Sequence, residues 1–120
     1  MNVLNVETNS SQIPSSSLNT LHIALLKLAE VNPTMPVSQS IAFLTVVKNE
    51  GRSLAELAKV SHIKQSTMSR YLLDLSNQGR SSATGHGLIR RETDPHELRR
   101  NMYTLTPKGR KLVQELIGKE

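Results

Sequence analysis

The fold is decided by residues 53–77, which read SLAELAKVSHIKQSTMSRYLLDLSN. Ser53 and Glu56 have the spacing of a capping box, in which the serine hydroxyl accepts from an orphan backbone amide and the glutamate reaches back to another. This pattern predicts a short helix over 54–60. A second helix is expected over 64–77, because an apolar periodicity resumes there after a brief turn.

The second helix is amphipathic. Met68, Leu72 and Leu75 recur at i, i+4 and i+7 and define its inner face. Its outward side chains are small or polar, namely Lys64, Gln65, Ser66, Thr67, Ser69 and Arg70. Small hydroxyls allow a helix to enter the DNA major groove, and glutamine and arginine offer donors and acceptors to base edges. Ordinary surface helices are also polar on one face, so the flanking sequence must distinguish the two cases.

The flanking sequence predicts three further helices. They are expected over 18–31, 38–50 and 107–117, the last with Thr106 as N-cap and Pro107 as the first helical residue. The second of them is expected to bury Ile41, Leu44 and Val47 on one face, to have Phe43 and Val46 beside that face, and to be capped by Gly51.

A β-hairpin is predicted between the fourth and fifth helices. Residues 88–92 and 101–105 are β-compatible, and a charged, proline-containing loop at 93–100 joins them. Two helices around a tight turn, followed by a basic hairpin, predict a mainly α fold with a small β wing, the winged helix-turn-helix. Residues 1–17 are polar and aperiodic, which predicts a flexible tail before a single domain over 18–120.

The first predicted helix is apolar around most of its circumference. Leu18, Leu21, Leu25 and Leu28 follow heptad-like spacing, and further apolar residues widen the stripe. Such a helix is expected to be buried on two sides, and in a small domain the second side can belong to another subunit.

Charge is distributed unevenly along the 120 residues. Residues 1–50 carry two basic and three acidic side chains, whereas residues 51–120 carry thirteen basic and seven acidic ones. The basic excess therefore lies on the helix-turn-helix and the hairpin, which is the electrostatic pattern of nucleic-acid binding.

Enzyme signals are weak. The chain has no cysteine, which excludes disulfides, thiolate metal sites and a cysteine nucleophile. Ser61 and Lys64 match the Ser-x-x-Lys spacing of acyl-enzymes but lack its partner motifs, and the four histidines lack metal-ligand spacing. We expect no catalytic residue, no metal site and no cofactor. No apolar run could span a bilayer and no secretory leader is recognisable, which predicts a soluble cytoplasmic protein without a membrane partner.

The sequence resembles the MarR family of bacterial winged-helix regulators over about residues 35–116. The similar motifs are SLAELA at 53–58, QSTMSR at 65–70, LIRR at 88–91, DPHELR at 94–99 and LTPKGRKL at 105–112. The resemblance implies double-stranded DNA as partner, with the outward face of 64–70 in the major groove. It also implies DNA contacts from the wing arginines Arg90, Arg91, Arg99 and Arg100, with Arg99 in the minor groove.

Family members are homodimers on palindromic sites and mostly act as repressors, and their dimers are built from N- and C-terminal helices. Carried over to this sequence, the resemblance implies dimer contacts by Leu18, Leu21, Leu25, Leu28, Leu112 and Leu116.

The sequence departs from the family pattern at three places. Lys64 stands where an Asp or Ser usually caps the recognition helix, so Ser61 or Ser66 would have to supply the cap. Residues 80–86 form an insertion before the wing. The chain ends at Glu120, which shortens the dimer interface and the effector cleft, so the sequence leaves a small-molecule effector open. Such a truncated variant would suit a bacterial or phage regulator.

A second function is compatible with the sequence. The same fold could be a protein-interaction module that binds a partner such as a polymerase or a replication factor. Salt-dependent binding to duplex DNA distinguishes the two hypotheses.

Overall fold

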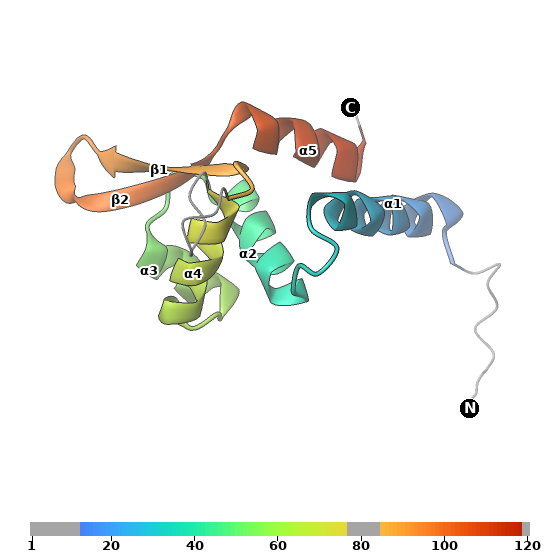
Figure 1. Cartoon of the computed structure of the whole chain (residues 1–120), viewed down its shortest axis with the longest axis horizontal. Helices are drawn as coiled ribbons and strands as arrows, with labels where there is room; N and C mark the ends of the chain where they lie inside the picture. The colour runs from blue at the N-terminus through green and yellow to red at the C-terminus, as the bar shows by residue number, and fades with distance from the viewer. Residues whose placement is uncertain (1–12, 77–84, 119–120) are drawn as a thin grey trace.

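The computed structural model describes residues 13–76 and 85–118, which form five helices and one hairpin (Figure 1). The elements are, in chain order, α1 (Ser15–Val31), α2 (Val37–Lys48), α3 (Leu54–Ser61), α4 (Gln65–Leu75), β1 (Ile89–Asp94), β2 (Glu97–Leu105) and α5 (Pro107–Ile117). No helix among these is long and apolar enough to cross a membrane. The predicted mainly α architecture with a β-hairpin wing is confirmed.

Helices α3 and α4 form the predicted helix-turn-helix. Ser53 Oγ accepts from Glu56 N, and Glu56 Oε1 accepts from Ser53 N, so the capping box is confirmed. The turn is completed by His62, whose φ of 62° lies in the left-handed region. Helix α4 is shorter than the predicted 64–77, because Lys64 is its N-cap and Ser76 its C-cap.

The inner face of α4 is correctly predicted. Met68, Leu72 and Leu75 are all buried and belong to the main core cluster. Polar contacts also hold α4 against α2, since the Ser38 and Tyr71 hydroxyls share a hydrogen bond and Gln39 Nε2 donates to Tyr71 O.

The hairpin is longer than predicted. Its strands pair antiparallel from Ile89 with Leu105 to Asp94 with Glu97, and a register shift follows Thr93. Most of the expected 93–100 loop is therefore strand. A tight turn suffices because Asp94 Oδ1 accepts from His96 N and stabilises it locally.

Several contacts fix the base of the hairpin to the neighbouring segments. An isolated bridge joins Arg52 to Tyr103 on the edge of β2. At the start of α5, Thr106 Oγ1 accepts from Gly109 N, which confirms the predicted cap. Glu50 bonds this junction, because its carboxylate accepts from Leu105 N and from Arg110.

The prediction for α2 is wrong in its buried face and its end. Ala42, Phe43 and Val46 are buried, whereas Ile41 and Leu44 are exposed. The C-cap is Asn49, and Gly51 serves the following turn with a φ of 86°. The helix is apolar on several sides, so periodicity alone does not select the inward one.

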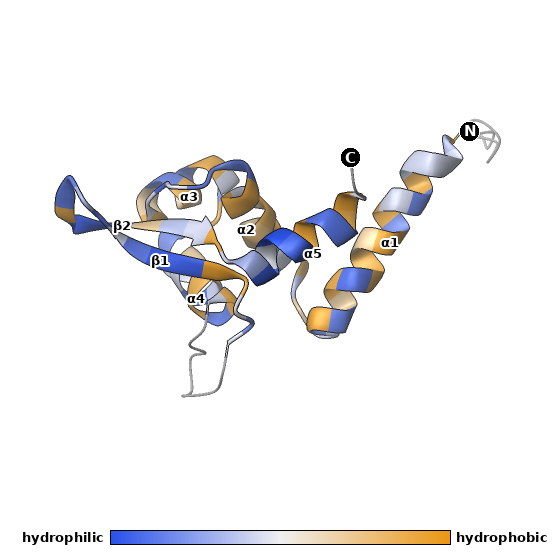
Figure 2. Ribbon diagram, turned by 90° about the horizontal axis from the view of Figure 1, so that it is seen from above, coloured by the Kyte–Doolittle hydropathy of each residue, from blue (hydrophilic) through white to orange (hydrophobic). Residues whose placement is uncertain are grey.

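Helix α1 packs beside α5 and away from the hairpin (Figures 1 and 2). It begins at Ser15, so residues 15–17 of the predicted tail are helical, while residues 1–12 lie outside the described part of the chain. The expected two-sided burial is not present within the chain: of the α1 residues, only Leu28 is buried.

Candidate nucleic-acid interface

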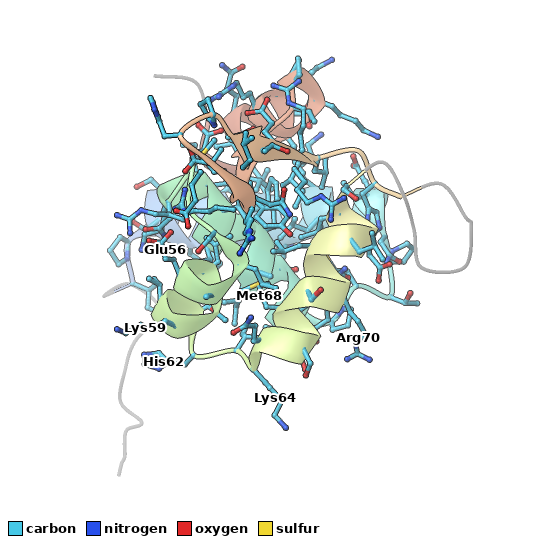
Figure 3. All side chains as sticks on the ribbon, turned by 90° about the vertical axis from the view of Figure 1, so that its left-hand side faces the viewer. Glu56, Lys59, His62, Lys64, Met68 and Arg70 are labelled. Carbon is cyan, nitrogen blue, oxygen red and sulfur yellow. The ribbon has the colours of Figure 1, made fainter. Side chains whose placement is uncertain are left out.

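The outward face of α4 is uncovered. Lys64, Gln65, Ser66, Ser69 and Arg70 are exposed and Thr67 is partly buried, as their alternation with the buried leucines and Met68 requires. Figure 3 shows Met68 directed between α3 and α4, Lys64 at the turn, and Arg70 on the opposite side of α4 from α3. The six sequence-predicted residues therefore lie on the N-cap and the first two turns of α4, with the positive charges of Lys64 and Arg70 at the two ends of the set.

The N-terminus of α4 has no side-chain cap. Ser61, one of the two predicted substitutes, is used by the turn instead: its hydroxyl donates to Ala58 O and accepts from Ile63 N. No side chain of the described residues therefore caps the first backbone amides of α4, and the positive end of the helix dipole lies beside Lys64, which favours anions there.

The four wing arginines fall into two pairs. Arg90 Nε lies 3.0 Å from Glu92 Oε2, and Arg100 makes ion pairs with both Glu56 and Asp94. Arg91 and Arg99 are exposed and belong to no ion pair of the described residues. Arg91 and Arg99 are therefore the wing cations available to an external anion.

Arg100 bridges the wing and α3. Its Nη2 donates to Glu56 Oε1 at 2.7 Å and its Nη1 donates to Asp94 Oδ2 at 2.9 Å. The pKa of Glu56 is lowered to about 2, chiefly by the backbone hydrogen bond from Ser53 and then by Arg100. The pKa of Asp94 is lowered by the His96 amide and by Arg100, and that of Arg100 is raised by its two carboxylate partners.

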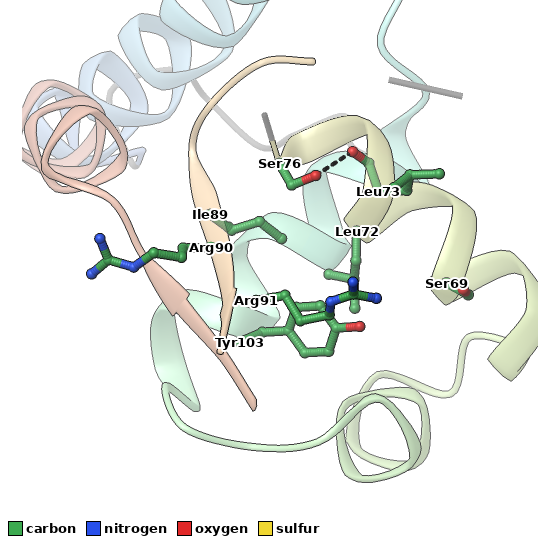
Figure 4. A pocket seen from close by; sticks show the side chains of 8 residues that line it. All are labelled: Ser69, Leu72, Leu73, Ser76, Ile89, Arg90, Arg91 and Tyr103. Carbon is green, nitrogen blue, oxygen red and sulfur yellow. Dashed lines mark hydrogen bonds between the residues drawn. The ribbon is translucent and has the colours of Figure 1, made fainter. Parts of the chain in front are cut away.

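A hollow of about 410 Å³ separates α4 from the hairpin (Figure 4). Ser69 and Leu72 line its helix side, and Arg91 and Tyr103 line its strand side. Arg91 and Tyr103 are cross-strand partners, and Figure 4 shows the guanidinium beside the phenol ring. This places Arg91 across the hollow from Ser69, one of the six predicted residues of α4.

The base of the hairpin is fixed to the C-terminal end of α4. His86 N and Nδ1 both lie within hydrogen-bond distance of Asp74 O, and Leu88 N donates to Leu75 O. Gly85 is needed there, because an added Cβ would collide with the Ser76 carbonyl. Residues 80–84 of the predicted insertion lie outside the described residues, but the chain rejoins the fold at a defined place.

Sequence reasoning missed Glu56 and His86 as residues that position the site. Glu56 was found as a helix cap, which gave no indication of its second partner 44 residues away. His86 carried no signal, because its partners, the Asp74 carbonyl and the Lys108 ammonium that donates to His86 O, are 12 and 22 residues away along the chain.

The predicted dimer residues differ in accessibility. Leu18, Leu21 and Leu25 of α1 are 53–56% exposed. In contrast, Leu28, Leu112 and Leu116 are buried in the core of the chain itself, while Ile117 is exposed. The exposed face of α1 is thus the part of the predicted set that a second subunit could reach.

The described residues contain no cluster of three or more potential metal-ligating His, Cys, Asp or Glu side chains. Ser61 and Lys64, the pair with Ser-x-x-Lys spacing, lie in the turn between α3 and α4, where the Ser61 hydroxyl is hydrogen-bonded to backbone groups.

No family model matches the chain, and no curated protein matches it by sequence. Solved structures do. A MarR-family transcription regulator aligns with a TM-score of 0.59 and 20% identity over 92% of this chain and 64% of its own. RV1404 from Mycobacterium tuberculosis aligns with a TM-score of 0.64 and 21% identity over 95% of this chain and 72% of its own. The MepR–DNA complex of S. aureus aligns with a TM-score of 0.62 and 24% identity over 82% of this chain and 73% of its own.

The chain therefore has the winged helix-turn-helix fold. Its structural neighbours include MarR-family transcription regulators, in agreement with the sequence resemblance. The chain spans just under two thirds of the first of these structures and nearly three quarters of the other two.

Proposed function

We propose that this protein is a sequence-specific, double-stranded DNA-binding transcription regulator. The observation that carries the proposal is the uncovered polar face of α4, one residue of which, Ser69, lines the same hollow as Arg91 of the wing. In this proposal α4 enters the major groove, where Gln65 and Arg70 read base edges. The hairpin follows the backbone, and Arg99 at its tip enters the adjacent minor groove.

The protein acts in this proposal as a homodimer. The exposed leucines of α1, Leu18, Leu21 and Leu25, supply the apolar contact. A twofold dimer reads a palindrome with half-sites about 10 bp apart, because one helical turn places both recognition helices on one side of the duplex. A dimer seated on a promoter would exclude polymerase, so we propose repression as the outcome.

The solved neighbours are consistent with this proposal. One is the S. aureus MepR–DNA complex, and another is described by regulation of the DNA binding of Bordetella bronchiseptica BpsR by 6-hydroxynicotinic acid. We propose no effector for the present chain.

Selection from a random duplex library tests the proposal. The parent should enrich an inverted repeat, and Arg70→Ala should bind that site about 1–3 kcal/mol more weakly and tolerate more bases at one position of each half-site. Lys111→Ala removes an equal charge from the exposed surface of α5 and serves as the control. If Arg70→Ala binds the selected site as tightly as the parent, α4 is not the reading helix.

A further inference from the structure

One carboxylate oxygen joins two elements that are distant in sequence. Glu56 Oε1 accepts from Ser53 N at 2.9 Å, which caps α3, and from Arg100 Nη2 at 2.7 Å, which holds the hairpin. Arg100 continues to Asp94 Oδ2, and the other oxygen of Asp94 accepts from His96 N in the turn. A continuous path of hydrogen bonds thus runs from the first turn of α3 to the tip of the wing.

This path is the polar attachment of the outer wing. Within the described residues, one polar side-chain contact joins residues 91–101 to a helix, and this is the hydrogen-bonded ion pair of Arg100 with Glu56. Other anchors, among them Leu88 to Leu75, Tyr103 to Arg52 and Leu105 to Glu50, lie at the base of the hairpin. The outer strands therefore depend on this contact, because an isolated pair of strands is only marginally stable in water.

The charges in this path do not suit a phosphate ligand. Glu56 and Asp94 carry two negative charges against the single positive charge of Arg100, so the cluster sums to −1. Both carboxylates stay ionised at neutral pH, since their pKa values are lowered. The guanidinium side chain is 26% exposed, and both of its terminal nitrogens already donate to carboxylates.

We propose that Arg100 is a positioning residue, which together with Glu56 and Asp94 clamps the wing against α3 and so sets its distance from α4. The purpose of the clamp rests on the proposed DNA-binding function: it holds Arg99 where the minor groove passes while α4 occupies the major groove. Arg100 itself makes no phosphate contact in this arrangement.

Hydrogen exchange in the free protein tests the clamp without any DNA. Glu56→Gln keeps the capping box, because glutamine also serves at this position of the motif, but it removes the charge that holds Arg100. Amides of residues 91–101 should exchange about threefold to tenfold faster than in the parent, while those of α3 and α4 stay unchanged. Glu92→Gln, which breaks the Arg90 pair within the hairpin, is the matched control and should leave exchange near parent values. Equal exchange in Glu56→Gln and the parent would overturn the clamp.

DNA binding tests what the clamp is for. Removing a negative charge near DNA should strengthen binding if Glu56 has only an electrostatic role. The clamp predicts the opposite sign: Glu56→Gln and Arg100→Gln each weaken binding to the selected site by about threefold to tenfold, and the double variant loses no more than either single one.

Two further readouts separate positioning from phosphate contact. Both variants should keep the parent's slope of log affinity against log salt, and hydroxyl-radical protection should weaken at the minor-groove flank but remain at the major-groove half-site. Tighter binding by Glu56→Gln, or a slope that falls by about 1 per chain in Arg100→Gln, would overturn the proposal. If the parent binds no duplex, the regulator function fails, whereas the exchange result still decides whether the clamp exists.

Discussion

Replacing the four wing arginines with glutamine, one at a time, should separate those that contact phosphate from those that do not. Each phosphate contact contributes about −0.9 to the slope of log affinity against log salt on duplex DNA, because a bound cation releases condensed counterions. Within the described residues, Arg91 and Arg99 belong to no ion pair, whereas Arg90 and Arg100 are bound to carboxylates. The structure therefore predicts that only the unpaired arginines change the slope.

The magnitude follows from the symmetry of the proposed dimer. Losing Arg91 from both subunits removes two contacts and reduces the slope by about 1.8, so the affinity ratio of parent to variant shrinks about 12-fold between 50 and 200 mM salt. Arg90→Gln and Arg100→Gln should leave the slope within error of the parent. Fluorescence anisotropy on the selected duplex measures all five proteins, with Lys111→Gln as a charge-matched control. An unchanged slope in both Arg91→Gln and Arg99→Gln would refute this division of the wing.

Three other predictions concern packing, assembly and pH. A glycine-to-alanine change normally stabilises a helix by about 1 kcal/mol. At Gly109 an added Cβ collides with the Leu88 carbonyl, so we expect urea unfolding of Gly109→Ala to show a free energy of unfolding about 1–3 kcal/mol lower than that of the parent. A higher free energy of unfolding would contradict the close approach. Leu21→Glu should shift sedimentation towards the monomer, whereas Leu98→Glu should not, although Leu98 on the wing is even more exposed than Leu21. An unchanged dimer in Leu21→Glu would remove α1 from the interface. The folded-state pKa of Glu56 lies below its ordinary value of 4.5, at about 2. Its contribution to folding stability is therefore present above pH 4.5 and lost as the pH falls towards 2. The melting temperature of the parent should fall more steeply over this range than that of Glu56→Gln, and parallel curves of melting temperature against pH would contradict the assignment.

Local rules predicted the helix-turn-helix well. The capping box, the i, i+4, i+7 leucine and methionine spacing, and the Thr106–Pro107 helix start each depend on residues within one or two turns of one another. The wing was predicted too short because its turn is stabilised by an Asp94 side chain that also bonds Arg100, a contact that composition does not reveal. The inward face of α2 was wrong because an apolar residue on either side of the helix satisfies the same pattern.

The candidate site was predictable in its members but not in their roles. The polar face of α4 follows from periodicity, whereas the state of each wing arginine depends on a tertiary partner. Arg90 pairs with a residue two positions away, yet Arg100 pairs across 44 residues. Charge counts cannot separate these cases, since every wing arginine adds the same +1 to the sum.

Titration of the parent protein against random-sequence duplex at two salt concentrations tests whether the protein binds DNA through its basic surface. Lys64 and Arg70 on the outward side of α4, and Arg91 and Arg99 on the wing, belong to no ion pair within the described residues. A dimer that uses most of them on phosphates should lose about 10³-fold or more in affinity between about 50 and 200 mM salt. Absence of duplex binding at both concentrations would contradict the account and favour a protein-interaction module.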